Sequence, residues 1–200
     1  MVRKPRIAPR PSSDWDAEVF DALAVMMRQG DSEAAQRNEP GAPRVVNALG
    51  LLMRYPALAK AFLTFNRHLL FNSSLSDRIR ELLILRIAWL RRAEYEWAQH
   101  VLLAQKAGLR KEEIEAVKEG PGCAVWAPLD AALLRAVDEL HADAFVADTT
   151  WDVLAAGLDQ RQLMDLVFTV GAYDLLAMAF NTFGLQLDPG LEGFGKLRSE

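Results

Sequence analysis

The chain has 200 residues, of which 51% are hydrophobic and 25% charged, and its formal net charge is −4. This length fits one domain with a sizeable core, and an acidic balance without a basic stripe excludes nucleic acid as an expected partner. A single cysteine, Cys123, excludes an intramolecular disulfide framework and is typical of a reducing, cytoplasmic location.

Apolar periodicity along the chain predicts helices and no strands. Residues 1–13 are basic and lack the apolar core of a secretory signal, so a flexible arm is expected there. A single all-α domain is expected over residues 14–187, followed by a tail at residues 188–200. Its predicted helices cover residues 14–28, 45–54, 56–70, 76–90, 94–107, 111–118, 129–143, a short stretch ending at 156, and 159–183, with a polar loop at residues 30–44. The predicted N-caps are Ser13, Ser74 or Ser76, and Thr149 or Thr150.

The most apolar stretch, LMDLVFTVGAYDLLAMAF at residues 163–180, has the composition of a weak membrane-span candidate. Asp165 and Asp174 interrupt it, and the apolar run between them is too short for a span. We therefore expect a buried helix and no membrane association.

Residues 81–100, ELLILRIAWLRRAEYEWAQH, place three titratable groups on two strongly apolar helices joined by a short turn. At ~1.5 Å per residue, Glu81 lies about 15 Å before the turn and His100 about 12 Å after it. Short connections make antiparallel helix neighbours, so these two side chains are predicted to face each other. Glu96 precedes His100 by four residues and is expected on nearly the same face.

A buried carboxylate beside an imidazole can perform acid–base chemistry, because the carboxylate sets the tautomer of the ring that carries the proton. The same spacing also fits a core histidine that only bridges two helices. A metal site is a third interpretation, because Glu96 and His100 share a helix face, but no second histidine lies nearby to complete a zinc set. No metal is therefore expected.

The string RIRELLILRIAWLRRAEYEWAQHVLLAQKAGLRKEEIEAV resembles the core of the carboxymuconolactone decarboxylase family, which includes the alkylhydroperoxidase D group. The shared features are an REL-type helix start, a Y-E-W-x-x-H run and an A-x-x-x-G-L-x-x-E-E-I stretch, and the similarity extends over residues 49–187. The resemblance implies an alkylhydroperoxidase D-like helical bundle with a central antiparallel helix hairpin. It also implies a homo-oligomer, either a trimer or a hexamer.

The peroxidase branch of this family carries C-x-x-C-x-x-x-H with a glutamate one helix earlier. His100 and Glu81 match its histidine and glutamate, whereas Ala93 and Glu96 occupy its cysteine positions. Peroxide reduction needs a thiolate, which neither residue supplies. The resemblance therefore favours the lactone decarboxylase branch, which uses no cofactor.

The leading hypothesis is a cofactor-free acid–base enzyme that acts on a small carboxylated lactone or a related intermediate of aromatic catabolism. His100 is the predicted general acid or base, Glu81 orients it, and Glu96 is a second carboxylate in the same pocket. One alternative is an alkylhydroperoxidase-like antioxidant protein that uses Cys123. The other is a non-catalytic oligomeric protein that binds a small molecule.

Four further residues are candidates for contact with the small-molecule substrate. Arg86 interrupts an apolar run and predicts either a structural ion pair or a clamp for a substrate carboxylate. Tyr95 and Trp97 fit a pocket for a ring-shaped ligand, and equally a core or an oligomer contact. His68 lies at the end of a predicted helix, where a cation favours the helix dipole, and is a weaker pocket candidate.

Overall fold

A computed structural model describes residues 4–26 and 46–194 of the chain. These residues form one short 3-10 helix, nine α-helices and no strand, which confirms the predicted all-α fold. The loop expected at residues 30–44 lies outside the described residues. The elements are η1 (Ser12–Asp14), α1 (Ala17–Ala24), α2 (Val46–Leu52), α3 (Pro56–Phe71), α4 (Asp77–Leu90), α5 (Glu94–Lys106), α6 (Lys111–Glu119), α7 (Pro128–Asp143), α8 (Asp148–Gly157) and α9 (Gln160–Phe183).

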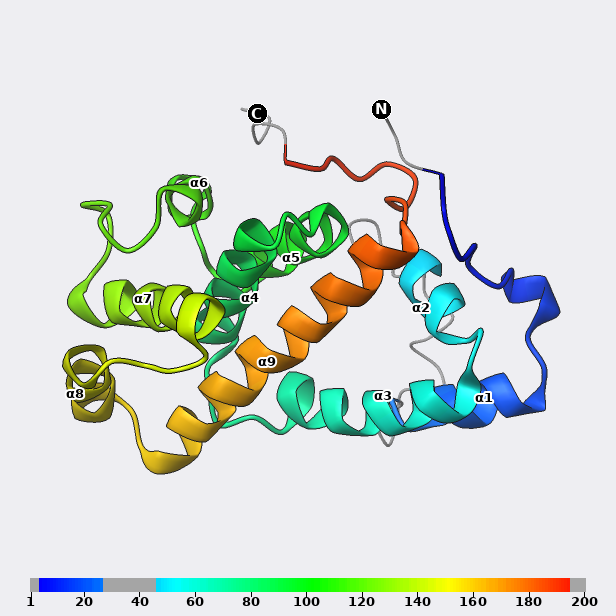
Figure 1. The fold of residues 1–200 in the computed structure, drawn as a ribbon, viewed down its shortest axis with the longest axis horizontal. Helices are drawn as coiled ribbons and strands as arrows, with labels where there is room; N and C mark the ends of the chain where they lie inside the picture. Colours follow the sequence, from blue (N-terminus) through cyan, green and yellow to red (C-terminus); the bar gives the residue numbers. More distant parts are fainter. Residues whose placement is uncertain (1–3, 27–45, 195–200) are drawn as a thin grey trace.

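Helix α4 is the central rod of the fold. All its residues from 81 to 88 are buried, and α5, α6, α7 and α9 pack around it. Figure 1 shows the long helix α9 running diagonally past α4, with α1 to α3 toward one end of the molecule and α6 to α8 toward the other. Because α4 is covered on every side, any polar group on it must find its partner inside the protein.

Side-chain caps fix the start of two helices that matter for the candidate site. Ser76 caps α4 by accepting a hydrogen bond from the Ile79 backbone N–H, as predicted. Asp16, and not Ser13, caps α1. The predicted threonine cap of α8 is also wrong, because Ala147 occupies the cap position and the Thr150 hydroxyl donates instead to Glu139.

Asp165 of α9 fastens the turn between α3 and α4. Its Oδ2 accepts hydrogen bonds from the Ser74 backbone N–H and hydroxyl, both at 2.7 Å, and from the Ser73 hydroxyl at 3.0 Å. Its Oδ1 lies 3.1 Å from His68 Nε2. One carboxylate therefore satisfies most of the polar groups of this turn and holds α9 against the start of α4.

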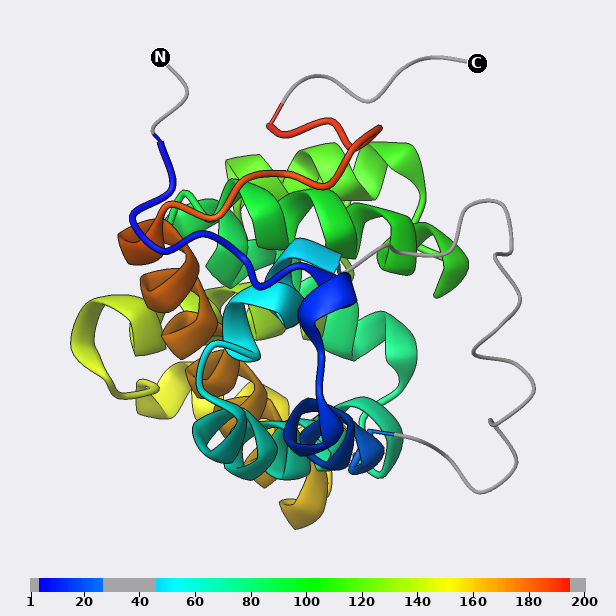
Figure 2. The ribbon, with the colours of Figure 1, turned by 90° about the vertical axis from the view of Figure 1, so that its right-hand side faces the viewer.

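The described ends of the chain pack on the helical body, as Figure 2 shows. The Arg6 backbone N–H donates to the Phe183 carbonyl at 2.8 Å, and the Arg10 backbone N–H donates to the Gly50 carbonyl at 2.7 Å. Arg54 Nε donates to the Ala8 carbonyl at 2.8 Å. The described part of the segment expected to be a flexible arm is thus fastened to α2 and to the end of α9.

Helix α9 is the one described helix that is long and apolar enough to cross a membrane by length and composition alone. Within its most apolar window, 56% is buried inside the protein. Its inner face packs on the core through residues that include Leu166, Val170 and Tyr173. This burial is what the sequence predicted for a core helix.

We expect Asp165→Ala to destabilise the protein by about 1–3 kcal/mol at neutral pH, because buried donors of the turn lose their acceptor. Burial raises the pKa of Asp165, but the hydrogen bonds from Ser74, His68 and Ser73 outweigh burial and lower it below its usual value of 3.8. The contribution of Asp165 is therefore complete above that value and lost as the pH falls below it. Urea denaturation across the acidic range will measure it, with exposed Asp152→Ala as control; a pH-independent loss contradicts this assignment.

Candidate active site

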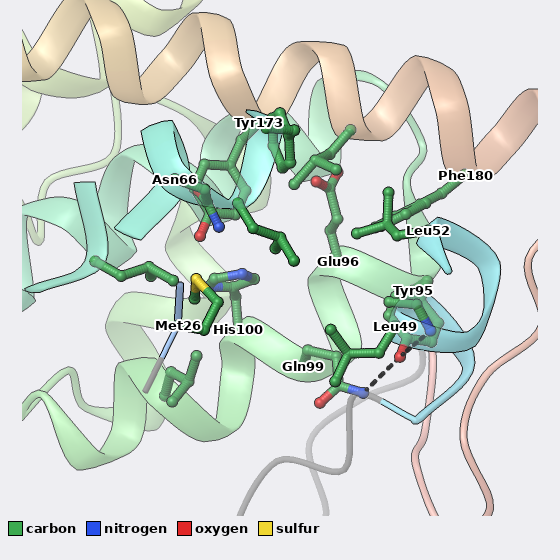
Figure 3. A pocket seen from close by; sticks show the side chains of 16 residues that line it. Met26, Leu49, Leu52, Asn66, Tyr95, Glu96, Gln99, His100, Tyr173 and Phe180 are labelled. Carbon is green, nitrogen blue, oxygen red and sulfur yellow. Dashed lines mark hydrogen bonds between the residues drawn. The ribbon is translucent and has the colours of Figure 1, made fainter. Parts of the chain in front are cut away.

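A cavity of about 170 Å³ lies between α2, α3, α5 and α9. Its wall is mostly apolar, and Figure 3 shows the polar side chains that reach it. They are Asn66, Tyr95, Glu96, Gln99, His100 and Tyr173. The volume slightly exceeds that of an apolar protein cavity of about 150 Å³ that binds benzene, so the cavity suits a molecule the size of one ring.

His100 and Glu81 form the predicted pair across the central hairpin. His100 Nδ1 lies 2.7 Å from Glu81 Oε2, and both side chains are buried. Glu81 Oε1 accepts a further hydrogen bond from Arg80 Nε at 3.2 Å. His100 lines the cavity, while Glu81 lies behind it. The geometry predicted from helix rise is therefore confirmed.

The pair fixes the tautomer of His100. An ionised carboxylate only accepts hydrogen bonds, so Glu81 holds the proton of His100 on Nδ1. In the neutral ring the lone pair then resides on Nε2, for which the described residues provide no hydrogen-bond partner. The Tyr173 ring packs edge-on against His100, with 4.9 Å between the ring centroids, and restricts rotation of the imidazole. This is the arrangement of an oriented proton acceptor.

Glu96 has a different environment although it lies one turn from His100. It is 2% exposed, and among the described residues neither of its carboxyl oxygens has a hydrogen-bond partner. Burial first, and the negative charge of Asp174 second, raise the pKa of Glu96 well above its usual value. The nearby Arg91 is engaged by Asp174 through two hydrogen bonds. Glu96 is therefore a neutral carboxylic acid at neutral pH.

Tyr95 lines the cavity, as expected, and its hydroxyl is tied to the C-terminal tail. It donates to Asp188 Oδ2 at 2.6 Å, and Gln99 Nε2 donates to the same oxygen at 2.8 Å. Asp188 Oδ1 accepts from the Asn47 backbone N–H at 2.9 Å, which fastens the start of α2 over the cavity. Burial, followed by the hydrogen bond to Asp188, raises the pKa of Tyr95. Asp188 thus organises this wall from beyond the expected domain end at residue 187.

Arg86 does not line the cavity, which corrects the expectation of a substrate clamp. Its Nε and Nη2 donate to the Asp138 carboxylate at 2.6 and 2.9 Å, and its Nη1 donates to the Val117 carbonyl at 2.6 Å. A Cβ atom at Gly120 would lie 2.7 Å from Arg86 Nη2, so the glycine leaves room for the guanidinium. Of the two interpretations, the structural ion pair is the one that the geometry supports.

Trp97 and His68 also lie outside the cavity wall. Trp97 is buried against Trp89 and Phe194, with ring centroids 5.6 and 5.9 Å away, so it belongs to the core. The His68 side chain is 53% exposed and contacts Asp165. Spacing alone could not separate the side of α5 that carries Tyr95 from the side that carries Trp97.

Sequence reasoning missed Tyr173, Asn66 and Asp188. Tyr173 lies in a helix whose apolar pattern is continuous, so no local contrast marked it. Burial raises the pKa of Tyr173, and Glu81 and Glu96 raise it further, which keeps the phenol protonated. Asp188 lies in a segment rich in glycine and proline, and its partners are about ninety residues away along the chain.

Cys123 lies between α6 and α7 and does not line the cavity. Its side chain is partly buried against the core. Within residues 4–26 and 46–194, no three histidine, cysteine, aspartate or glutamate residues are grouped so that they could hold a metal ion.

The helical arrangement is that of alkylhydroperoxidase D-like proteins. A peroxidase-related protein from Silicibacter sp. TM1040 aligns with 94% of this chain and 96% of its own, at 14% identity and a TM-score of 0.72. A peroxidase-related protein from Ralstonia eutropha with an alkylhydroperoxidase AhpD core gives 92%, 93%, 16% and 0.69 for the same measures. The debrominase Bmp8 in complex with 2,3,4-tribromopyrrole gives 92%, 91%, 13% and 0.71. At these identities the similarity shows the fold alone.

Residues 56–139, from the start of α3 into α7, match the model of the carboxymuconolactone decarboxylase family. No curated protein matches the chain in sequence. The match contains the central hairpin with Glu81, Glu96 and His100. In this central segment the chain belongs to the carboxymuconolactone decarboxylase family, on an alkylhydroperoxidase D-like fold.

The buried carboxyl group makes stability depend on pH in a predictable direction. Because the folded pKa of Glu96 is raised, its contribution is complete below the unfolded value near 4.5 and is lost as the pH rises toward the folded value. We expect Glu96→Gln to become progressively more stable than the wild type above that pH, by at most about 1.4 kcal/mol per pH unit. Chemical denaturation at several pH values will measure the difference. The exposed Glu112→Gln serves as control, and a pH-independent difference for Glu96→Gln contradicts a buried neutral carboxyl.

Proposed function

We propose that this protein is a cofactor-free acid–base enzyme that moves a proton on a small, largely apolar molecule bound in the 170 Å³ cavity. The observation that carries the proposal is the 2.7 Å contact between His100 Nδ1 and Glu81, which orients His100 in the cavity wall. A histidine with a fixed tautomer beside a ligand cavity has the arrangement that general acid–base catalysis needs.

In the proposed step, His100 Nε2 takes a proton from the ligand and returns it at the same or a neighbouring atom. Glu81 stabilises the imidazolium that forms between these two transfers, and Arg80 keeps the Glu81 carboxylate in place. The cycle starts and ends with the same protonation states, so the protein itself needs no oxidant or reductant.

The decarboxylation of a lactone belongs to this class of reaction, because protonation of carbon follows the loss of carbon dioxide. The predicted clamp for a substrate carboxylate is not supported, since Arg86 is bound to Asp138. Among the described residues that line the cavity there is no lysine or arginine. Proton transfer next to a carbonyl group is therefore the part of the hypothesis that this cavity favours.

The two alternatives receive different support. A binding protein without catalysis would also have this cavity, but it would not need an oriented imidazole in its wall. An antioxidant protein that uses Cys123 gains nothing from the cavity, because Cys123 lies outside its wall. We therefore propose the acid–base enzyme alone.

We also propose that the protein forms a homo-oligomer through the outer face of α9. Met164, Phe168, Leu175 and Met178 are each at least half exposed and follow one another at intervals of four, seven and three residues, with Gly171 between. This is the spacing of a helix–helix seam. The stripe carries no charge and matches its own copy in length, so α9 of a second copy is the proposed partner.

His100→Gln is expected to lower turnover by about 10²–10⁴-fold, the range that general acid–base catalysis supplies. A panel of small cyclic ketones and unsaturated lactones in deuterium oxide provides the assay, with nuclear magnetic resonance detecting deuterium at the carbon next to the carbonyl and release of carbon dioxide. Circular dichroism will check that the variant keeps its helices. Equal activity of His100→Gln and wild type on every active compound would sink the assignment.

Leu175→Glu is expected to weaken self-association by at least about tenfold, because it places a charge in the apolar seam, at a cost of about 1.4 kcal/mol or more. Sedimentation velocity over a concentration series will measure it. Val153→Glu is the matched control, since Val153 is also exposed but lies on α8. A wild type that is monomeric at all concentrations contradicts the proposal.

A further inference from the structure

The carboxyl group of Glu96 is a polar group in the cavity wall that the proton transfer described above does not use. The side chain is 2% exposed, and within the described part of the chain both of its oxygens lack a hydrogen-bond partner. Leaving a buried polar group unsatisfied costs about 1–3 kcal/mol, so native proteins rarely do it without a reason. Glu96 also fastens no helix, because it bonds to no neighbouring element. The missing partner therefore points to a ligand.

We propose that Glu96 donates a hydrogen bond to the oxygen of the substrate, and that the substrate is an uncharged, one-ring carbonyl compound. This inference rests on the proton transfer proposed for His100. It adds a second catalytic residue with a distinct task, and it defines the chemical class of the ligand.

The position of Glu96 suits this task. Glu96 and His100 are separated by one turn of α5, which places their Cβ atoms about 5–6 Å apart on one helix face. Both residues line the same cavity, as Figure 3 shows. A single ring can therefore place its carbonyl oxygen at Glu96 and the adjacent carbon at His100 Nε2.

The charges around the cavity favour a neutral ligand over an anion. Glu81 lies behind His100, and Asp174 is close enough to Glu96 to affect its ionisation. The described wall has no lysine or arginine to offset these carboxylates. A ligand carboxylate would lose its water without gaining a cation other than protonated His100, which is costly in an apolar cavity.

The chemistry balances without any further reactant. His100 Nε2 takes the proton from the carbon next to the carbonyl, and the electron pair of that bond moves onto the carbonyl oxygen. The O–H of neutral Glu96 stabilises the negative charge that develops there, as a preorganised donor does in an oxyanion hole. His100 then returns the proton to carbon. An uncharged carboxylic acid in an apolar site is a known solution for stabilising such an enolate.

The test uses cyclohexanone and cyclohexanecarboxylate, which share a ring but differ in charge. Binding to the full-length protein is measured by nuclear magnetic resonance titration, and infrared spectroscopy follows the carbonyl stretch of isotope-labelled cyclohexanone. We expect the wild type to bind cyclohexanone at least about tenfold more tightly than the carboxylate, a difference of about 1.4 kcal/mol. The stretch of the bound ketone should move to lower frequency, because its oxygen accepts a hydrogen bond.

Glu96→Leu should abolish the frequency shift and weaken cyclohexanone binding by about tenfold. Glu96→Gln, which keeps a donor of similar shape, should retain part of the shift. His100→Gln should retain the shift and lose only the deuterium exchange, which separates this inference from the role of His100. Glu112→Leu is the matched surface control.

Three outcomes overturn the inference. They are an unchanged shift in Glu96→Leu, equal or tighter binding of the carboxylate, and no binding of cyclohexanone to the wild type. If the Glu96-dependent shift is present but His100→Gln leaves deuterium exchange unchanged, the ligand contact stands and the proton-transfer role of His100 fails.

Discussion

The hydrogen bond between Glu81 and His100 is the constraint on which the rest of the site depends. A carboxylate in the middle of the most buried helix loses its hydration, and only partners with good geometry can compensate for that loss. His100 and Arg80 are those partners, and they come from two directions. Because Arg80 also donates to the Leu70 carbonyl at the end of α3, the same group fixes α3, α4 and α5 in one register. The ring that transfers the proton is therefore held by the core.

The cavity differs from this anchor because its walls come from segments that are far apart in the chain. Asp188 joins Tyr95 and Gln99 of α5 to the start of α2, which covers one side, while α9 contributes Tyr173 on another. Removing any one of these elements would open the apolar space to water, which would weaken every electrostatic effect inside it. The C-terminal segment thus contributes to the site by closing it.

This division explains what the sequence could predict. The Glu81–His100 contact was predictable because both residues lie near one turn, so helix rise alone gives their relative level. The wall was not predictable in the same way, because the pairing of Asp188 with Tyr95 depends on tertiary packing that no local period encodes. Arg86 shows the limit for single residues, since a buried arginine among apolar neighbours predicts a partner but does not say whether that partner is Asp138 or a ligand.

The replacement of the family's cysteines changes what the hairpin can do without changing its geometry. Glu96 occupies a position that carries a thiol in the peroxidase branch, one turn before the histidine that both types of site retain. A thiolate needs surroundings that stabilise negative charge, whereas the apolar wall and Asp174 favour the uncharged form of Glu96. In the same place, a carboxyl group therefore becomes a proton-bearing donor instead of a nucleophile. Since His100 keeps its Glu81 partner, the site retains the oriented base and gains an acid beside it, which is the combination that proton transfer next to a carbonyl requires.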